Sequence, residues 1–265
     1  MYIDTHTHLN SPKLFSKAWK ILSQFENMWW TKLLNVWVDE NYNQRAIDLV
    51  DKYDTNIDVK ASIWYHPSEV VFGKITKDNL SNKMDALEKL YNTNKSKIVA
   101  IWECGIDRHY TKDDKIKLQQ TLLNNQAQLA RKFDVPIIVH SRDGFQETID
   151  ILNDFRDLKV YFHCRGYGVK QIETVQDIFD KVWIGFAGNL TYPKADKLDN
   201  SLMKVKLNSL FLETDAPYLA PQAKRWKQNS PVYIKYLYEY VAKKLDISLI
   251  DLQSQISNNF DKFLL

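Results

Sequence analysis

The chain has 265 residues, of which 45% are apolar and 26% charged, and its formal net charge is +3. This composition predicts a large folded core and excludes a disordered chain. The mild positive charge fits an anionic substrate but excludes a dedicated DNA-coating protein. No stretch is long and apolar enough for a membrane span, and we expect no signal peptide and no membrane partner. Two cysteines in a chain of this length indicate a reducing compartment, so we expect a cytoplasmic protein.

Short apolar runs of the kind that form buried parallel strands recur eight times along the chain. They lie at residues 2–6, 32–38, 59–65, 97–103, 136–140, 159–163, 181–187 and 209–214.

Longer stretches with helical spacing separate these runs, and two more follow the last run. They lie at residues 13–27, 43–53, 81–91, 113–133, 145–155, 169–179, 193–205, 231–245 and 248–263. Eight strand–helix units predict parallel pairing, and eight is the number that closes a TIM (β/α)8 barrel. No linker or change of composition divides the chain, so we expect one α/β domain over residues 1–265. An open doubly wound sheet is the structural alternative, but no glycine-rich first turn of the dinucleotide-binding type is present.

The opening sequence MYIDTHTHLN places His6 and His8 at the end of the first run. Side chains two apart on a strand point to the same face, so the two imidazoles converge as metal ligands do. Acid and imidazole side chains also follow four later runs. These are Glu103, His140, His163 and Asp215. All six residues are therefore expected at the carboxyl-terminal rim, where barrel enzymes carry their active sites.

Six such ligands, with one carboxylate able to bridge, predict two divalent cations. They divide into His6, His8 and Asp215 for one cation and His140 and His163 for the other, with Glu103 between them. Mixed imidazole and carboxylate ligands suit Zn²⁺ or Mn²⁺ and suit Mg²⁺ less well, and the sequence does not choose among these ions.

The motifs around these residues resemble those of the TatD-type metal-dependent deoxyribonucleases, which are TIM barrels of the amidohydrolase superfamily. The matching segments are THTHLN, ASIWYHP, VAIWECGID, PIIVHSRD, FHCRGYG, IGFAGNLT and LETDAPYLAP with RWKQNSP. They run through nearly the whole chain in the order that the family shows. The resemblance implies a dinuclear enzyme that hydrolyses DNA phosphodiester bonds, commonly from the 3′ end of single strands, by attack of a metal-held hydroxide.

The resemblance also assigns roles to single residues. Asp215 is the expected acceptor of the water proton, and Glu103 is expected to hold the two cations together, so both are predicted catalytic residues. Glu213, two residues before Asp215, either orients a ligand imidazole or forms a salt bridge at the rim of the core. His66, in the HP pair of the family, is predicted to face the substrate because the six other positions already fill two metal sites.

Two arginines are candidate substrate contacts, because a guanidinium group matches the geometry of phosphate oxygens. They are Arg142 and Arg225, and the alternative for each is a structural ion pair, which is the more expected for Arg142 because Asp143 follows it. The mild net charge predicts weak, salt-sensitive binding of single-stranded DNA. We expect a monomer.

Five tryptophans occupy positions where the family pattern has glycine. They are Trp29, Trp37, Trp64, Trp102 and Trp226, in a chain that holds 8 tryptophans but only 7 glycines. A tryptophan at a glycine position of a barrel strand would overfill the core. We hypothesise that these codons are UGA, translated here as tryptophan but read as glycine in the source organism. A divergent homologue with compensating small neighbours is the alternative.

Two other functions compete with the nuclease. An amidohydrolase-type enzyme would keep the metal site and act on an amide, lactone or other ester. Many such barrels carry a bridging lysine on the fourth strand, where this chain has Glu103, and this difference favours the phosphodiester substrate. A non-catalytic binding scaffold is disfavoured, because a binding protein has no need of an open dinuclear centre.

Overall fold

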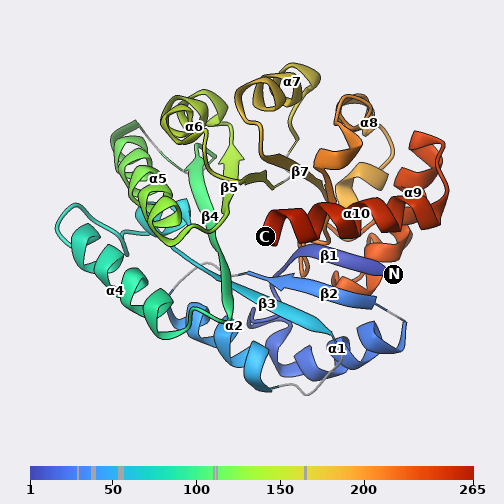
Figure 1. Cartoon of the computed structure of the whole chain (residues 1–265), viewed down its shortest axis with the longest axis horizontal. Helices are drawn as coiled ribbons and strands as arrows, with labels where there is room; N and C mark the ends of the chain where they lie inside the picture. Colours follow the sequence, from blue (N-terminus) through green and yellow to red (C-terminus); the bar gives the residue numbers. More distant parts are fainter. Residues whose placement is uncertain (29, 37–39, 53–56, 110, 112, 164–165) are drawn as a thin grey trace.

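A computed structural model describes the chain except for residues 29, 37–39, 53–56, 110, 112 and 164–165. Within the described residues, eight parallel strands form one sheet in the order β1 to β8, with helices around it, so the TIM barrel prediction is confirmed (Figure 1). The strands are β1 Tyr2–Thr7, β2 Trp30–Asn35, β3 Asp58–Ile63, β4 Ile98–Asp107, β5 Ile137–Arg142, β6 Val160–Phe162, β7 Val182–Phe186 and β8 Leu210–Leu212.

The helices follow the predicted stretches, apart from α3, which was not predicted. They are α1 Ala18–Asn27, α2 Glu40–Lys52, α3 Pro67–Val71, α4 Leu80–Thr93, α5 Asp113–Phe133, α6 Phe145–Leu152, α7 Val169–Ile178, α8 Asp196–Leu202, α9 Ile234–Leu245 and α10 Leu249–Leu264. Short 3₁₀ helices lie at Phe15–Lys17, Asn153–Phe155, Gly188–Thr191, Leu207–Ser209, Gln222–Lys224 and Pro231–Tyr233. No described helix meets the length and apolarity that crossing a membrane requires.

The strands are buried on both faces, as parallel strands in a barrel must be. Every residue of β6, β7 and β8 is buried, and so are the first five residues of β5. This explains why these segments read as continuous apolar runs with no alternation.

The last strand meets the first through a short junction. β8 and β1 share one isolated bridge, between Thr7 and Ala216. The His8 N–H also donates to the Ala216 carbonyl at 2.8 Å, and the Asp215 N–H donates to the His6 carbonyl at 3.0 Å. The barrel is therefore nearly closed, and its junction lies beside two of the predicted ligands.

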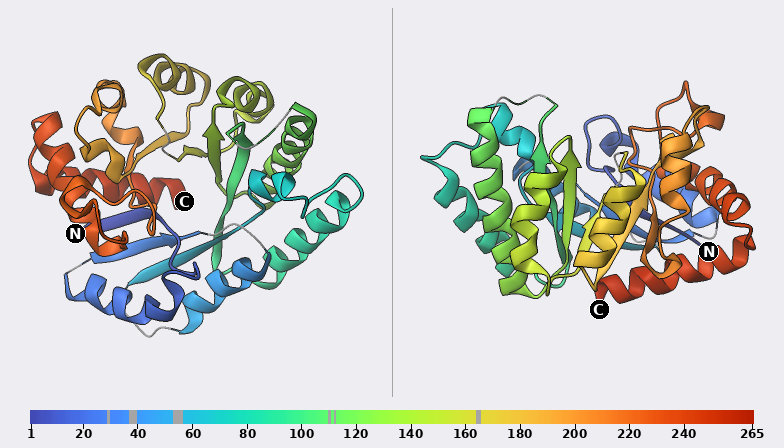
Figure 2. Two further views of the ribbon diagram at one scale, coloured as in Figure 1. Left: turned by 180° about the vertical axis from the view of Figure 1, so that it is seen from behind. Right: turned by 90° about the horizontal axis from the view of Figure 1, so that it is seen from above.

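Helix α10 covers the end of the barrel opposite the predicted site, as the right-hand view of Figure 2 shows. Near the end of this helix, Phe263 makes edge contacts with Tyr161, Trp183 and Phe211, with ring centroids 5.9, 5.2 and 5.5 Å apart. These three residues lie on β6, β7 and β8, so the contacts fill the amino-terminal end of the barrel with aromatic rings.

Two of the five unusual tryptophans have described side chains. Trp64, just after β3, is fully buried, and its backbone pairs with the Asn43 side chain through hydrogen bonds of 3.0 and 3.2 Å. Trp226 is 95% exposed. Trp29 and Trp37 lie outside the described residues, as does the side chain of Trp102.

Candidate metal centre

The first predicted ligand group lies together at the β8–β1 junction. His6 Nε2 is 3.0 Å from His8 Nε2, and Asp215 Oδ1 is 3.2 and 3.1 Å from these two atoms. His8 Nδ1 lies 3.0 Å from the Val36 carbonyl oxygen, which can only accept a hydrogen bond. The Nε2 atom of neutral His8 therefore carries a lone pair that points toward His6 and Asp215.

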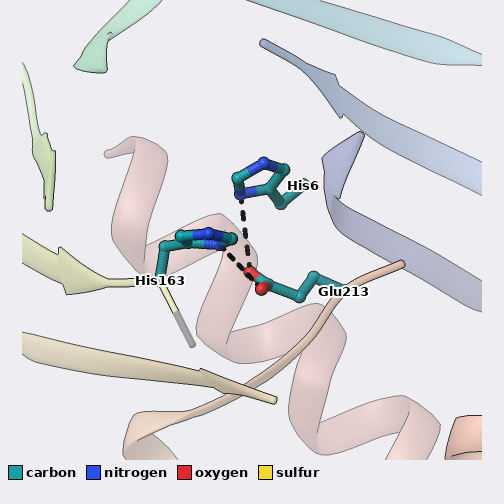
Figure 3. Close-up of side chains that lie close together, drawn as sticks. All are labelled: His6, His163 and Glu213. Carbon is teal, nitrogen blue, oxygen red and sulfur yellow. Dashed lines mark ion pairs between the residues drawn. The ribbon is translucent and has the colours of Figure 1, made fainter. Parts of the chain in front are cut away.

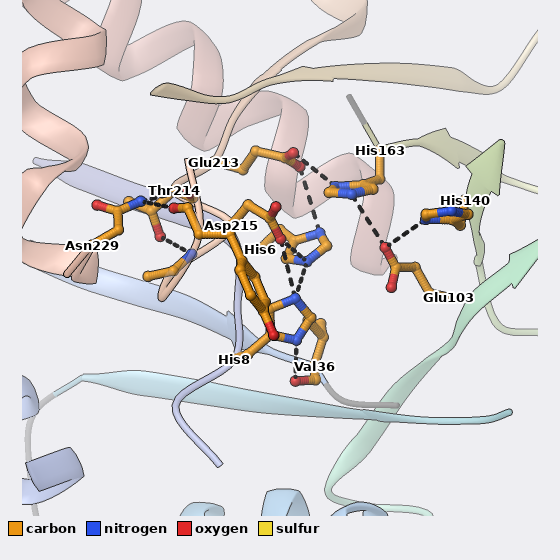
Figure 4. A network of polar contacts seen from close by, with 12 residues as sticks. His6, His8, Val36, Glu103, His140, His163, Glu213, Thr214, Asp215 and Asn229 are labelled. Carbon is orange, nitrogen blue, oxygen red and sulfur yellow. Dashed lines mark hydrogen bonds and ion pairs between the residues drawn. The ribbon is translucent and has the colours of Figure 1, made fainter. Parts of the chain in front are cut away.

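The second predicted ligand group is centred on Glu103. Its Oε1 atom lies 3.3 Å from His140 Nδ1 and 3.2 Å from His163 Nε2. The ring centroids of His6 and His163 are 4.0 Å apart, so the two groups are neighbours (Figure 4). All six predicted ligands are thus brought to one place, and each is at most 3% exposed.

Glu103 does not end its strand, as the apolar run had predicted, because β4 continues to Asp107. The pairing of β4 with β5 shifts register between residues 102 and 104, which is the pattern of a β-bulge. A bulge turns a side chain out of simple alternation, and here Glu103 faces the histidines from within the strand.

Glu213 lies beneath the two groups (Figure 3). Its carboxylate is 2.7 Å from His163 Nδ1 and 3.6 Å from His6 Nδ1, and it is fully buried. Of the two roles open for Glu213, this position favours the orientation of ligand imidazoles.

Asp107 is a residue of the site that our sequence analysis missed. Its Oδ2 atom lies 3.0 Å from His140 Nε2, and its Oδ1 atom accepts a hydrogen bond from the His109 N–H at 2.8 Å. The spacing of Glu103, Gly105 and Asp107 contained a signal, since alternate residues of a strand share a face, but the apolar run had ended at residue 103.

His66 also approaches Glu103, with its Nε2 atom 3.7 Å from Oε2. Its Nδ1 atom accepts a hydrogen bond from the Ser68 N–H at 3.0 Å, where His66 caps helix α3. Neutral His66 therefore carries its proton on Nε2, which makes this nitrogen a hydrogen-bond donor toward the site. This tautomer supports the predicted role in facing the substrate.

The two candidate arginines occupy different surroundings. Arg142 ends β5 and lines a cavity of about 670 Å³ above the ligand groups, together with His66, Asp107 and Tyr218. Arg225 is not among the described residues of that cavity lining. Its guanidinium group packs over the Tyr192 ring at 3.9 Å and donates a hydrogen bond to the Tyr192 hydroxyl at 2.8 Å.

The buried ionisable groups shift one another's pKa values strongly. Burial raises the pKa of Glu103, but His163, His140 and His66 outweigh it and hold that pKa well below its usual value. Burial likewise raises the pKa of Asp215, and His6 and His8 hold it well below the ordinary range. Both groups are therefore carboxylates at neutral pH.

The pKa values of the two histidines beside Glu213 shift in opposite directions. Burial, together with His163, lowers the pKa of His6 to about 4. Burial also opposes the charge of His163, but the carboxylates of Glu213 and Glu103 raise its pKa to about 9. Without a metal, His163 thus carries a positive charge beside these carboxylates at neutral pH.

The donor set fits divalent cations. Three groups among the described residues bring three potential ligand atoms within 4.8 Å of one another: His6, His8 and Asp215; His66, Glu103 and His140; and His6, His163 and Glu213. Buried imidazole nitrogens about 3 Å from each other and from carboxylate oxygens are the donors that Zn²⁺ and Mn²⁺ prefer.

A parallel barrel with buried imidazole and carboxylate groups at its carboxyl-terminal rim is an arrangement of metal-dependent hydrolases. The chain belongs to the TatD family of these enzymes, because the family described as "TatD related DNase" matches residues 3–265.

Relatives agree with this assignment. The chain is 28% identical over 264 residues to the metal-dependent hydrolase YabD of Bacillus subtilis, covering 98% of this chain and 97% of YabD. It is 30% identical over 272 residues to the metal-dependent hydrolase MG009 of Mycoplasma genitalium, covering 98% of each chain. The crystal structure of YjjV, a TatD homologue from Escherichia coli, has the same fold, with a TM-score of 0.88 and 24% identity over 99% of this chain and 97% of YjjV.

Proposed function

We propose that the protein is a deoxyribonuclease that removes nucleotides from the 3′ end of single-stranded DNA, using two divalent cations. The observation that carries this proposal is the cavity of about 670 Å³, which joins the buried ligands His140 and Asp215 to the donors His66 and Arg142. A cavity of this size accommodates a nucleotide, and a guanidinium group with an imidazole N–H suits phosphate oxygens. Family membership agrees with a nucleic-acid substrate.

We assign the ligands as the sequence predicts. His6, His8 and Asp215 hold one cation, His140 and His163 hold the other, and Glu103 lies between the two groups. When bound, the cations supply Lewis acidity toward phosphate oxygens and activate water at neutral pH.

The protein groups then position the substrate and move protons. The Asp215 carboxylate accepts the proton of the attacking water, and the low pKa of this group keeps it ionised at neutral pH. Arg142 binds a non-bridging phosphate oxygen, and His66 Nε2–H donates a hydrogen bond to another oxygen of the same phosphate. Arg225 contacts the strand outside the cavity, beside Tyr192.

The test is nucleotide release from single-stranded DNA labelled at its 3′ end, with Mg²⁺ or Mn²⁺ added. The chain as written is compared with its Glu103→Ala variant, and each is compared with a version that has glycine at Trp29, Trp37, Trp64, Trp102 and Trp226. We expect metal-dependent release of labelled mononucleotide that the Glu103→Ala substitution abolishes. A folded, metal-loaded protein that releases no nucleotide in either version would reject the nuclease and direct the search to amides, lactones and other esters.

A further inference from the structure

A buried tyrosine contacts the carboxylate that underlies both ligand groups. Tyr161 lies on β6, two residues before His163, and is fully buried. Its hydroxyl donates a hydrogen bond to Glu213 Oε2 and lies 3.0 Å from Thr5 Oγ1. The single proton of the Thr5 hydroxyl goes either to Tyr161 or to the Leu212 carbonyl, which lies 3.1 Å from Oγ1. The phenol therefore lies between Glu213 on one side and Thr5 of β1 on the other.

Glu213 in turn contacts two imidazoles. Its carboxylate faces the Nδ1 atoms of His163 and His6, at 2.7 and 3.6 Å (Figure 3). The opposite nitrogens face the site, since His163 Nε2 is 3.2 Å from Glu103 and His6 Nε2 is 3.2 Å from Asp215. A carboxylate in this position keeps the protons on Nδ1 and leaves both Nε2 lone pairs for the cations.

The position of the phenol is fixed from two sides. The Tyr161 ring makes edge contacts with Phe211 and Phe263, with ring centroids 4.9 and 5.9 Å apart. On β7, a Cβ atom at Gly185 would lie 2.5 Å from the Tyr161 hydroxyl and 2.8 Å from Glu213 Oε2. Glycine at this position leaves the space in which the phenol and the carboxylate meet.

We propose that Tyr161 is a positioning residue of the metal centre, which acts through Glu213 on His6 and His163. This inference rests on the metal centre of the proposed function. Glu213 is fully buried, so no solvent replaces a lost hydrogen-bond donor. Without the phenol, the contacts that remain to the carboxylate among the described residues are the two imidazoles. The carboxylate then shifts toward one of them, and the two Nε2 atoms lose their common orientation.

The test compares two tyrosine-to-phenylalanine substitutions. Tyr161→Phe removes the donor to Glu213. Tyr238→Phe is the matched control, because Tyr238 is also fully buried and, within the described part of the chain, its hydroxyl bonds the Ile3 backbone alone. The Ile3 N–H donates to it at 3.3 Å, and it donates to the Ile3 carbonyl at 3.1 Å. Dissociation constants for Zn²⁺ and Co²⁺ are measured by chelator competition in the absence of DNA, and the visible absorption of the Co²⁺ protein reports the ligand geometry.

We expect Tyr161→Phe to weaken metal binding on the order of tenfold and to change the Co²⁺ spectrum. Tyr238→Phe should lower the free energy of unfolding comparably but leave metal affinity and spectrum unchanged. In a Glu213→Gln background, Tyr161→Phe should cause no further loss of affinity, because the phenol acts only through that carboxylate. If Tyr161→Phe does not fold, Thr5→Val removes the other hydroxyl contact of Tyr161 and should cause a smaller loss in the same direction.

Equal affinity and identical spectra for the unsubstituted protein and a folded Tyr161→Phe variant would overturn the inference. Equal losses in the Tyr161→Phe and Tyr238→Phe variants would overturn it as well. An unsubstituted protein that binds no divalent cation would overturn the metal centre itself. A protein that binds cations tightly but leaves DNA intact would overturn the nuclease and leave the role of Tyr161 standing.

Discussion

The imidazole of His140 lies between two carboxylates, with Nδ1 3.3 Å from Glu103 and Nε2 3.0 Å from Asp107. One nitrogen of the ring therefore faces the ligand groups while the other is held by an acid on the same strand as Glu103. His140 and His163 thus each have a second carboxylate of their own, Asp107 for one and Glu213 for the other.

Replacing Asp107 with asparagine should weaken the second cation site. The amide lacks the charge that fixes the His140 proton on Nε2, and loss of such a partner costs about 10- to 100-fold in metal affinity or activity. Metal content after dialysis and kcat of the Asp107→Asn variant measure the effect. Asp157→Asn is the control, because Asp157 is an exposed partner of Arg131 and is not among the described residues that line the cavity. Unchanged metal content and kcat in Asp107→Asn would contradict this role.

The metal-free protein should lose stability as the pH rises from 7 to above 9. The pKa of His163 is raised from an ordinary value of 6.5 to about 9 in the folded state. Protonated His163 therefore stabilises the fold fully below the unfolded pKa, and this stabilisation is lost as the pH rises through about 9. It contributes on the order of 3 kcal/mol to the free energy of unfolding.

Thermal unfolding of chelator-treated protein at several pH values between 6 and 10 measures this loss. The melting temperature should fall across that window for the original chain and change less for a His163→Gln variant. Saturation with Zn²⁺ should reduce the fall, because the bound ion takes the place of the proton. A flat melting temperature between pH 7 and 9.5 in metal-free protein would show that His163 is neutral in the fold.

The two arginines should differ in their effect on substrate binding. Arg142 lines the cavity, so Arg142→Ala should raise KM for single-stranded DNA about tenfold or more through loss of a charged hydrogen bond. Arg225 stacks on Tyr192, so Arg225→Ala should have a smaller effect. Each substitution should lower the slope of log affinity against log salt concentration by about one, which is the effect of losing one phosphate contact. The KM of both variants is measured at several salt concentrations, and an Arg225→Ala effect larger than that of Arg142→Ala would reverse the assignment.

Trp64 allows a direct test of the UGA hypothesis. Its indole is fully buried, and its Nε1–H has no hydrogen-bond partner among the described residues. A native tryptophan in this position would lose about 3–5 kcal/mol of unfolding free energy on truncation. We expect Trp64→Gly to be at least as stable as the chain as written, because the fold would then have evolved around glycine.

Urea unfolding of the two proteins measures this difference. Trp183→Gly is the control, because Trp183 is buried among Phe211 and Phe263 and is not one of the five unusual tryptophans. It should lose several kcal/mol. A similar loss in Trp64→Gly would identify Trp64 as a genuine tryptophan, as would a UGG codon in the nucleotide sequence.

The sequence predicted all eight strands because parallel strands buried on both faces are continuous apolar runs. It placed the ligands at one rim because they follow those runs. The five-residue helix α3 was missed, since Pro67–Val71 is too short to show a helical period. The extension of β4 past Glu103 was missed because the apolar run ends at residue 103, and Asp107 was missed with it.

The partner of Glu213 could not be predicted for another reason. Tyr161 reads as an ordinary aromatic residue of an apolar strand, and its hydroxyl meets Glu213 only when β6 and β8 are both in place. Contacts between side chains 52 residues apart depend on the closed barrel and leave no local pattern.

The junction between β8 and β1 would give the proposed first cation site a structural role. Two of its ligands come from the second half of β1 or just beyond it, and the third follows β8, so a bound ion would cross-link the first strand to the last. Such a cross-link closes a loop of nearly the whole chain, and the free energy by which it stabilises the fold grows with the logarithm of the ion concentration over the dissociation constant. A chain that ends before β8 would keep His6, His8, Glu103, His140 and His163 and still have no first site. An ion would thus find its complete ligand group only where β8 and β1 have come together.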